Sequence, residues 1–119
     1  MYVNQMLGQY GEDKACGYLE ANNYKIIERN FRCRLGEIDI IAKDLTKNEL
    51  VFVEVKTRIS SNFGRPAQAV TYVKQRHIFN VAKYYIYLNS IKNTNIRFDV
   101  IEIYVKESQF KINHIKQIF

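Results

Sequence analysis

Three charged residues, Asp39, Glu54 and Lys56, fall inside segments that are otherwise largely apolar, where a charge is costly to desolvate unless it is paired or used. Asp39 stands in GEIDIIA, and Glu54 and Lys56 stand two positions apart in VFVEVK. Two neighbouring carboxylates repel each other, and a divalent cation between them removes that repulsion. A cation held in this way lowers the pKa of bound water and neutralises charge on a phosphodiester. These residue types therefore suit metal-dependent phosphodiester hydrolysis, in which Lys56 would orient or deprotonate water, or stabilise the transition state.

The two segments read as strands joined by a polar turn at residues 44–48. Successive side chains of a strand point to opposite faces, so Glu54 and Lys56 share one face of the second strand. Folding this hairpin brings Asp39 opposite or diagonal to Glu54. We therefore predict that Asp39 and Glu54 hold Mg²⁺, with Mn²⁺ as an alternative, helped by the backbone carbonyl of Val55.

Residues 2–22 read as a helix, because apolar residues recur at helical spacing along one broad face. Glu12 lies at the edge of that face, on the side of Ala15 and Leu19. It is either a solvated carboxylate or a third acid that reaches the hairpin site as an outer ligand or as the ligand of a second metal. Glu37 shares a face with Asp39, but its place near the start of the strand favours a solvated or salt-bridged residue.

Basic residues outnumber acidic ones, with 18 Lys and Arg against 12 Asp and Glu and a formal charge of +6. A basic balance suits a nucleic-acid partner. Arg34, Arg58, Arg65 and Lys74 are the candidate phosphate contacts. Each has a plainer alternative: a solvated strand edge for Arg34, an ordinary connection for the loop that holds Arg58 and Arg65, and a lysine that snorkels from an apolar surface for Lys74.

A second helix is predicted over residues 66–89, with Pro66 as its first residue. Its apolar stripe consists of Val70, Val73, His77, Val81, Tyr84 and Leu88, flanked by Ile78 and Tyr85. This placement favours a core role for His77. The opposite face interleaves basic residues with tyrosines, a pattern that can bind nucleic acid but is usually a solvated face.

Two further strands are expected after this helix. In the first, over residues 96–106, Asp99 is expected to pair with a basic residue such as Arg97. The second, over residues 110–118, is rich in lysine, which is typical of a sheet edge, and its His114 is expected to be exposed.

The length of 119 residues predicts one domain, 1–119, with a real hydrophobic core. The apolar runs are too short to span a bilayer, and the first ten residues lack the features of a signal peptide. These observations predict a cytoplasmic protein with no membrane partner. Cys16 and Cys33 form no CxxC motif and have no nearby histidine, so they are interpreted as small, partly buried residues rather than zinc ligands or a disulfide framework.

Taken together, the charged segments resemble the YraN-like family, which is grouped with the PD-(D/E)XK, or restriction-endonuclease-like, nucleases. The matching segments lie between Gly11 and Ile101 and are GEDKACGYL, RNFRCRLGEIDIIA, VFVEVKTR, FGRPAQAV with Lys74 after it, and RFDVI. The resemblance implies an α/β (α+β) fold with an αβββαβ core, in which a mixed central sheet is flanked by helices. It also implies a metal-dependent nuclease site, with Asp39 as the acid of the second strand and Glu54 with Lys56 as the E-x-K element.

Within that family resemblance, Glu12 matches the early helical glutamate of the Holliday-junction-resolvase-like branch, whose members cut branched DNA as homodimers. The proline usual before the first acid is Ile38 here. The resemblance therefore implies a Mg²⁺-dependent DNA endonuclease that acts on branched or structured DNA, with a homodimer as its expected assembly. Two alternatives remain: a non-catalytic nucleic-acid-binding module on the same fold, and a structural protein in which Glu54 and Lys56 form a buried ion pair.

Overall fold

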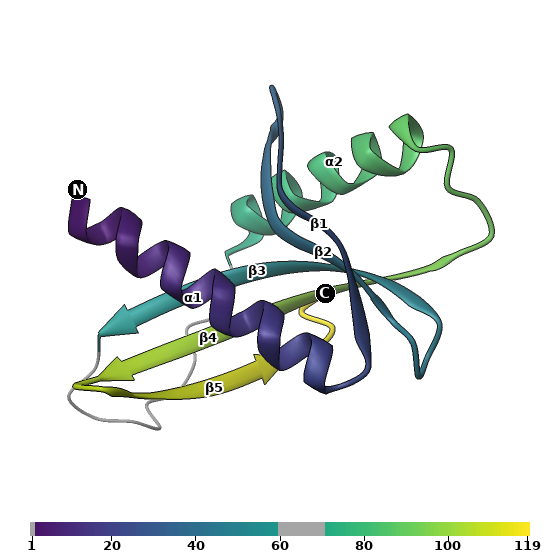
Figure 1. Ribbon diagram of the computed structural model, residues 1–119. Helices are drawn as coiled ribbons and strands as arrows, with labels where there is room; N and C mark the ends of the chain where they lie inside the picture. The colour runs from purple at the N-terminus through teal and green to yellow at the C-terminus, as the bar shows by residue number, and fades with distance from the viewer. Residues whose placement is uncertain (1, 60–70) are drawn as a thin grey trace.

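The computed structural model describes residues 2–59 and 71–119, and it has an α+β fold with one five-stranded mixed sheet (Figure 1). The elements are α1 (Tyr2–Ala21), β1 (Tyr24–Cys33), β2 (Gly36–Asp44), β3 (Glu49–Ile59), α2 (Tyr72–Leu88), β4 (Asn95–Lys106) and β5 (Gln109–Ile115). The strands lie side by side in chain order; β3 and β4 are parallel, and the other neighbours are antiparallel. The α+β class and the order of elements expected from the sequence are confirmed.

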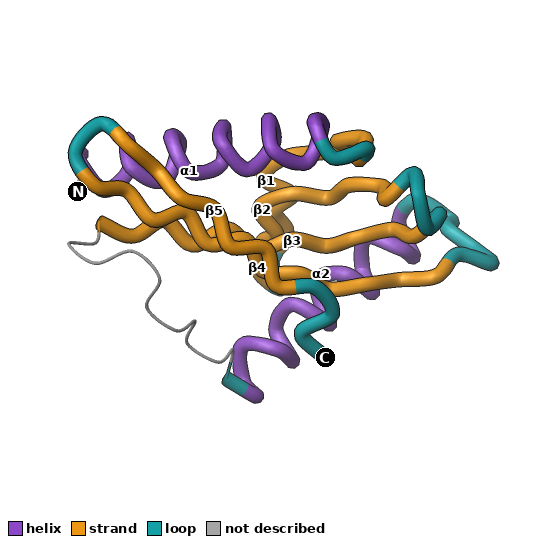
Figure 2. Tube along the Cα trace, turned by 90° about the horizontal axis from the view of Figure 1, so that it is seen from below, coloured by secondary structure: helices purple, strands orange, loops and turns teal. Residues whose placement is uncertain are grey.

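The two helices cover opposite faces of the sheet (Figure 2). Strand alternation divides the core accordingly. On the α1 side, Val51 and Val53 of β3 pack in one buried cluster with Leu19 of α1. On the α2 side, Phe52 packs in a second cluster with Val81 of α2. Residues that follow along β3 continue this alternation, so odd-numbered positions face α1 and even-numbered positions face α2.

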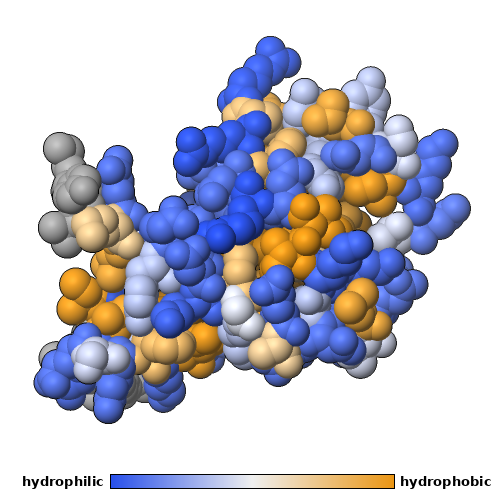
Figure 3. Space-filling view, in the orientation of Figure 1, coloured by the Kyte–Doolittle hydropathy of each residue, from blue (hydrophilic) through white to orange (hydrophobic). Residues whose placement is uncertain are grey.

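The β1–β2 hairpin bends away from the rest of the sheet and projects at the top of Figure 1, where its surface is mostly hydrophilic (Figure 3). Gly36 opens β2 with a φ of 140°, a backbone conformation that favours glycine. β1 stays paired with β2 as far as Cys33 and Gly36, whereas β2 pairs with β3 only from Asp44 back to Ile40. The two strands β2 and β3 therefore diverge at residue 39.

Helix α2 differs from the prediction in its start and in the face that it buries. It begins at Tyr72 behind the N-cap Thr71, and Pro66 lies outside the described residues. The residues that it buries are Ile78, Val81, Ala82 and Tyr85, so the predicted stripe was wrong at Val73, His77, Tyr84 and Leu88, all of which are exposed. The Tyr85 ring sets this rotation, because it packs edge-on against both Phe31 and Phe52, with centroid distances of 5.0 Å and 5.9 Å.

Strand β4 carries a buried ion-pair network on the α1 side of the sheet. The predicted pair is confirmed, because the Arg97 guanidinium donates to both carboxylate oxygens of Asp99 at 2.9 Å. Arg97 also donates to Asp44 and to the Tyr24 hydroxyl. These bonds fasten the start of β4 to the end of β2 and to β1. Burial alone would raise the pKa of both aspartates, but the Arg97 guanidinium lowers the pKa of Asp44, and hydrogen bonds from His114 and Arg97 lower the pKa of Asp99.

The expectation that His114 is exposed was wrong. Strand β5 pairs with β4 at the edge of the sheet, as predicted, but the His114 side chain is only 4% exposed. Its Nε2 lies 2.7 Å from Asp99 Oδ2, and its Nδ1 lies 2.9 Å from the Tyr18 hydroxyl. The histidine is buried because α1 covers this end of β5, a long-range contact that strand alternation alone does not predict.

Helix α1 approaches β3 closely at Gly11. A Cβ atom added to this glycine would overlap Thr57 Oγ1 and would lie 2.9 Å from Thr57 Cβ. Only a glycine lets the helix backbone come so near, and this contact fixes the height of the next residue, Glu12, above the sheet.

Neither of the helices within residues 2–59 and 71–119 combines the length and hydropathy needed to cross a membrane. Cys16 is buried and Cys33 half-buried, and both are free thiols, in agreement with the predicted small, partly buried residues.

Candidate active site

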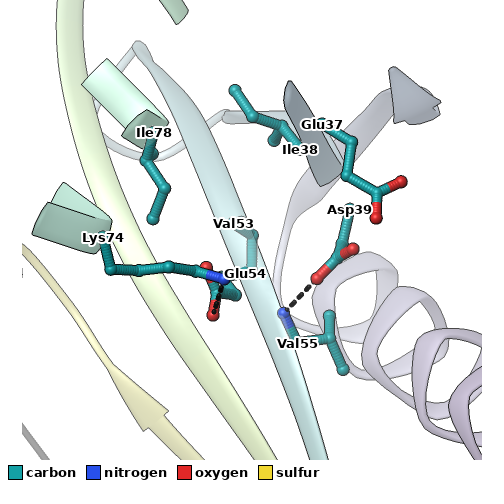
Figure 4. A pocket seen from close by; sticks show the side chains of 8 residues that line it. All are labelled: Glu37, Ile38, Asp39, Val53, Glu54, Val55, Lys74 and Ile78. Atoms are coloured by element: carbon teal, nitrogen blue, oxygen red, sulfur yellow. Dashed lines mark hydrogen bonds and ion pairs between the residues drawn. The ribbon is translucent and has the colours of Figure 1, made fainter. Parts of the chain in front are cut away.

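The candidate site lies at the fork where β2 separates from β3. One position beyond the last register pair, Ile40 with Val53, Asp39 would stand opposite Glu54. There the Asp39 carboxylate replaces a strand partner, because its Oδ2 accepts a hydrogen bond of 2.8 Å from the backbone N–H of Val55 (Figure 4). Asp39 was predicted to lie opposite or diagonal to Glu54; the paired register ends one position before them, and both residues line the same pocket.

Both acids line one pocket of about 170 Å³, which has room for several water molecules. Its walls come from β2, β3 and α2 and consist of Glu37, Ile38, Asp39, Val53, Glu54, Val55, Lys74 and Ile78. The Asp39 carboxylate points to the β3 backbone, and Glu54 points toward Lys74 (Figure 4). The pocket therefore presents carboxylate oxygens from two neighbouring strands to a shared space.

The electrostatics of this pocket disfavour the ionised form of Asp39. Burial raises its pKa from the ordinary value of 3.8 to about 6, the hydrogen bond from Val55 opposes that rise, and the negative charges of Glu12, Glu54 and Glu37 add to it. The site thus concentrates negative charge around a half-buried carboxylate. A cation among these oxygens would relieve the repulsion, so the donor set fits a hard divalent ion.

Glu12 was predicted to be either a solvated carboxylate or a third acid of the site, and the structure shows features of both. It is close enough to raise the pKa of Asp39, yet its Oε1 lies 3.6 Å from Nη2 of Arg29, which also binds Asp13 at 2.9 Å. Within residues 2–59 and 71–119, no three His, Cys, Asp or Glu side chains gather closely enough to hold one ion. The carboxylates that line the pocket are those of Glu37, Asp39 and Glu54, and Glu12 is an acid outside this lining.

Two lysines stand near Glu54, and the structure gives them different places. Lys56 follows Glu54 on the α2 side of β3 and is half-buried, in register with Glu102 of β4, but it does not line the pocket with the two acids. Lys74 reaches from α2 to the pocket, and its Nζ lies 3.5 Å from Glu54 Oε2 (Figure 4). The sequence marked Lys74 as a phosphate contact or a snorkelling lysine and missed its ion pair with Glu54.

The other predicted phosphate contacts are dispersed. Arg34 is exposed in the turn between β1 and β2, and Arg65 lies outside the described residues. Arg58 Nε lies 3.9 Å from Oε2 of Glu102, a buried acid of β4 that the sequence analysis did not identify. The signal for Glu102 was available, since a carboxylate inside the apolar run VIEIYV has the same pattern as Asp39 and Glu54.

Glu37 shows both features that the sequence considered for it. Its Oε2 accepts a hydrogen bond of 2.9 Å from Nε of Arg32, so the predicted salt bridge is confirmed. The same residue lines the pocket on the β2 side. It adds negative charge near Asp39 while its own charge is balanced by an exposed arginine.

Comparison with known proteins places the chain among close relatives. The sequence model of the Uncharacterised protein family UPF0102 matches residues 11–103. A UPF0102 protein of Caldicellulosiruptor saccharolyticus is 51% identical over 115 residues, which cover 95% of this chain and 96% of the relative. UPF0102 proteins of Clostridium perfringens strain 13 and Clostridioides difficile are each 47% identical, over 98% of this chain and 95% and 98% of the respective relatives.

Proposed function

This chain belongs to the Uncharacterised protein family UPF0102, and we propose that it is a metal-dependent endonuclease that hydrolyses phosphodiester bonds in DNA. The observation that carries this proposal is the fork between β2 and β3, where Asp39, with a pKa raised to about 6, shares a pocket with Glu54. The helix, three antiparallel strands and crossover helix that surround the fork support the resemblance to PD-(D/E)XK, restriction-endonuclease-like nucleases.

Asp39 and Glu54 would hold Mg²⁺, with Mn²⁺ as an alternative, and the backbone carbonyl of Val55 would complete the protein's donor set. Carboxylate and carbonyl oxygens are the ligands that hard cations prefer. When bound, the ion would act as a Lewis acid that lowers the pKa of its bound water and neutralises charge on the phosphodiester. Glu12 serves as an outer acid that strengthens the negative field at Asp39.

The chain's own residues prepare the site for this chemistry. The Val55 N–H holds the Asp39 carboxylate in one orientation, and Lys74 holds Glu54 against α2. We assign Lys56, two residues beyond Glu54 on the same face of β3, to the attacking water. Its Nζ orients that water or accepts a proton from it. The ammonium of Lys74 can leave Glu54 for a phosphate oxygen when substrate arrives.

The basic residues near the site support a nucleic-acid substrate. The chain has a formal charge of +6, and Lys74 is the basic residue among those that line the otherwise acidic pocket, so most of the positive charge lies outside the pocket. Arg34, Arg58 and Lys74 are the described candidates for phosphate contacts, and Arg65 is a fourth from the sequence. We further propose that residues 1–119 form one nuclease domain that acts as a homodimer on branched or structured DNA, because one small active site cuts one strand at a time.

A second candidate function is a non-catalytic nucleic-acid-binding module on the same fold. The ion pair between Lys74 and Glu54 favours it, because an ammonium group already neutralises one of the two carboxylates. Under this reading the pocket would hold lysine in place of a metal ion, and DNA would bind without being cut.

Calorimetric titration with Mg²⁺ and Mn²⁺ separates the two functions when it is combined with cleavage assays on duplex, single-stranded and branched DNA. The wild type is expected to bind the ion and to cut at least one substrate, and Asp39→Ala is expected to do neither. Asp13→Ala is the matched control, because Asp13 is an exposed acid paired with Arg29. DNA binding in EDTA with neither metal binding nor cleavage would refute the nuclease and leave the binding module.

A further inference from the structure

The outer face of α2, turned away from the sheet, exposes aromatic and basic side chains. Between Tyr72 and Leu88 the chain has three Lys or Arg residues, one His, and no Asp or Glu. Three of its rings are well exposed: Tyr72 at 69%, Phe79 at 47% and Tyr87 at 80%. Exposed rings that gather beside basic side chains on one face make that face a candidate interaction site.

Part of this face forms one wall of an open groove of about 430 Å³. The other wall is Phe119 at the end of the chain, whose ring stacks on Phe98 with a centroid distance of 4.6 Å. In the α2 wall of the groove a cation lies beside each of its two rings, Tyr72 and Phe79. The guanidinium of Arg76 lies 5.8 Å from the centre of the Tyr72 ring, and the ammonium of Lys83 lies 5.6 Å from the centre of the Phe79 ring.

These four residues follow each other at steps of four, three and four, so they form one line along the helix. At 1.5 Å per residue the line is about 16 Å long, which is roughly the length of five stacked nucleotides at about 3.4 Å each. Aromatic rings stack on unpaired bases, and lysine or arginine beside them binds the phosphates between those bases. The bases of a duplex are already stacked on each other and do not offer their faces to such a line.

The charge of the face decides between the occupants. A second copy of this chain would bring the same acid-free, basic helix, and the two positive faces would repel each other. A polyanion with flat, exposed rings complements both the charge and the aromatic side chains.

We propose that the groove along the outer face of α2 binds a single-stranded stretch of nucleic acid. Tyr72 and Phe79 stack on its bases, and Arg76 and Lys83 contact its phosphates. This inference rests on the proposed nuclease function, because Lys74 and Ile78 of the same helix line the active-site pocket. The substrate is thereby specified further: it carries an unpaired segment next to the position that is cut.

The test is fluorescence anisotropy with a labelled single-stranded oligothymidine of 20 nucleotides, in EDTA so that no cleavage occurs. Tyr72→Ala is expected to weaken binding by roughly 5- to 100-fold, the range for loss of one base–aromatic stack, and Tyr72→Phe is expected to restore it. Lys83→Ala is expected to lower the dependence of affinity on salt by about one phosphate contact. Lys92→Ala, the same change at an exposed position between α2 and β4, is the matched control and is expected to bind as the wild type does.

Three results would refute the proposed binding of single-stranded nucleic acid in the groove. They are no binding of the oligonucleotide by the wild type, equal affinity of Tyr72→Ala and the wild type, or equal losses of affinity in Lys83→Ala and Lys92→Ala. A change in sedimentation of Tyr72→Ala with unchanged oligonucleotide affinity would likewise overturn it and identify a second copy as the occupant. Cleavage assays on the same proteins keep the two proposals separate. Loss of binding in Tyr72→Ala without any cleavage by the wild type supports the groove and refutes the nuclease, whereas cleavage with unaltered binding does the reverse.

Discussion

Replacement of Asp39 with Asn is expected to stabilise the protein at neutral pH, although the proposed activity depends on this residue. Burial and the charges of Glu12, Glu54 and Glu37 raise the pKa of Asp39 from 3.8 to about 6. Asparagine has nearly the same shape and keeps an oxygen that can accept the hydrogen bond from Val55. The substitution therefore removes the unfavourable charge while it leaves the packing of the fork intact.

The size and direction of the effect follow from proton linkage. At about 1.36 kcal/mol per pKa unit, the difference between 3.8 and about 6 corresponds to about 3 kcal/mol. Because the folded state binds the proton more tightly than the unfolded state, the free energy of unfolding falls as the pH rises from 3.8 to about 6. Above that window the wild type has lost the whole contribution, and Asp39→Asn has lost none of it.

Urea unfolding followed by circular dichroism, in EDTA at pH 7.5 and pH 4, measures this difference. Asp39→Asn is expected to exceed the wild type by up to about 3 kcal/mol at pH 7.5 and by close to zero at pH 4. Asp13→Asn makes the same chemical change at an exposed ion pair and is expected to alter stability by less than about 1 kcal/mol. Added Mg²⁺ is expected to stabilise the wild type and not Asp39→Asn. A variant that is no more stable at pH 7.5, or whose advantage is the same at both pH values, would show that the fork does not penalise this charge.

Four further substitutions test the surrounding framework. Gly11→Ala is expected to lower the free energy of unfolding by about 2–3 kcal/mol, because the added Cβ meets Thr57. Gly17 has open space around it, so Gly17→Ala is expected to raise the free energy of unfolding by up to about 1 kcal/mol. Urea unfolding of both variants measures these changes. Arg97→Met is expected to cost about 3–5 kcal/mol in the same assay, because it removes the guanidinium that pairs with the buried carboxylates of Asp44 and Asp99. Lys74→Met is expected to change stability by less than about 1 kcal/mol and to tighten Mg²⁺ binding in calorimetry, since it removes the ammonium that competes for the pocket acid.

The hairpin at the centre of the site follows from local pattern alone. Alternation assigns Asp39 and Glu54 to two successive strands, and the polar turn at residues 44–48 determines which positions face each other. The structure confirms the hairpin, with the register running from Asp44 and Glu49 to Ile40 and Val53, one position before the two acids. Short-range rules succeed here because the two acids are brought together by one tight connection between neighbouring strands.

The features that sequence reasoning missed depend on contacts between distant segments. Helical spacing in α2 allows more than one apolar stripe, and the stripe through Tyr85 is buried in preference to the one through Tyr84 because two phenylalanine rings from β1 and β3 meet it. His114 is buried because its ring meets Tyr18, which lies 96 residues earlier in the chain. Lys74 and Glu54 likewise meet only after α2 has crossed the sheet. None of these pairings has a local signal.

The divergence of β2 from β3 links the cost of the site to its use. If the ladder continued, the Val55 N–H would bond to a strand carbonyl and no charge would be buried; instead the Asp39 carboxylate occupies that position and its ionised form is disfavoured. Lys74 pairs with Glu54 rather than with Asp39. Among the described residues, no lysine forms an ion pair with the Asp39 carboxylate. A carboxylate placed where ionisation costs free energy, beside a second acid in an open pocket, has a strong tendency to gain a cation. The same geometry that weakens the fold at neutral pH is therefore the reason to expect an ion there.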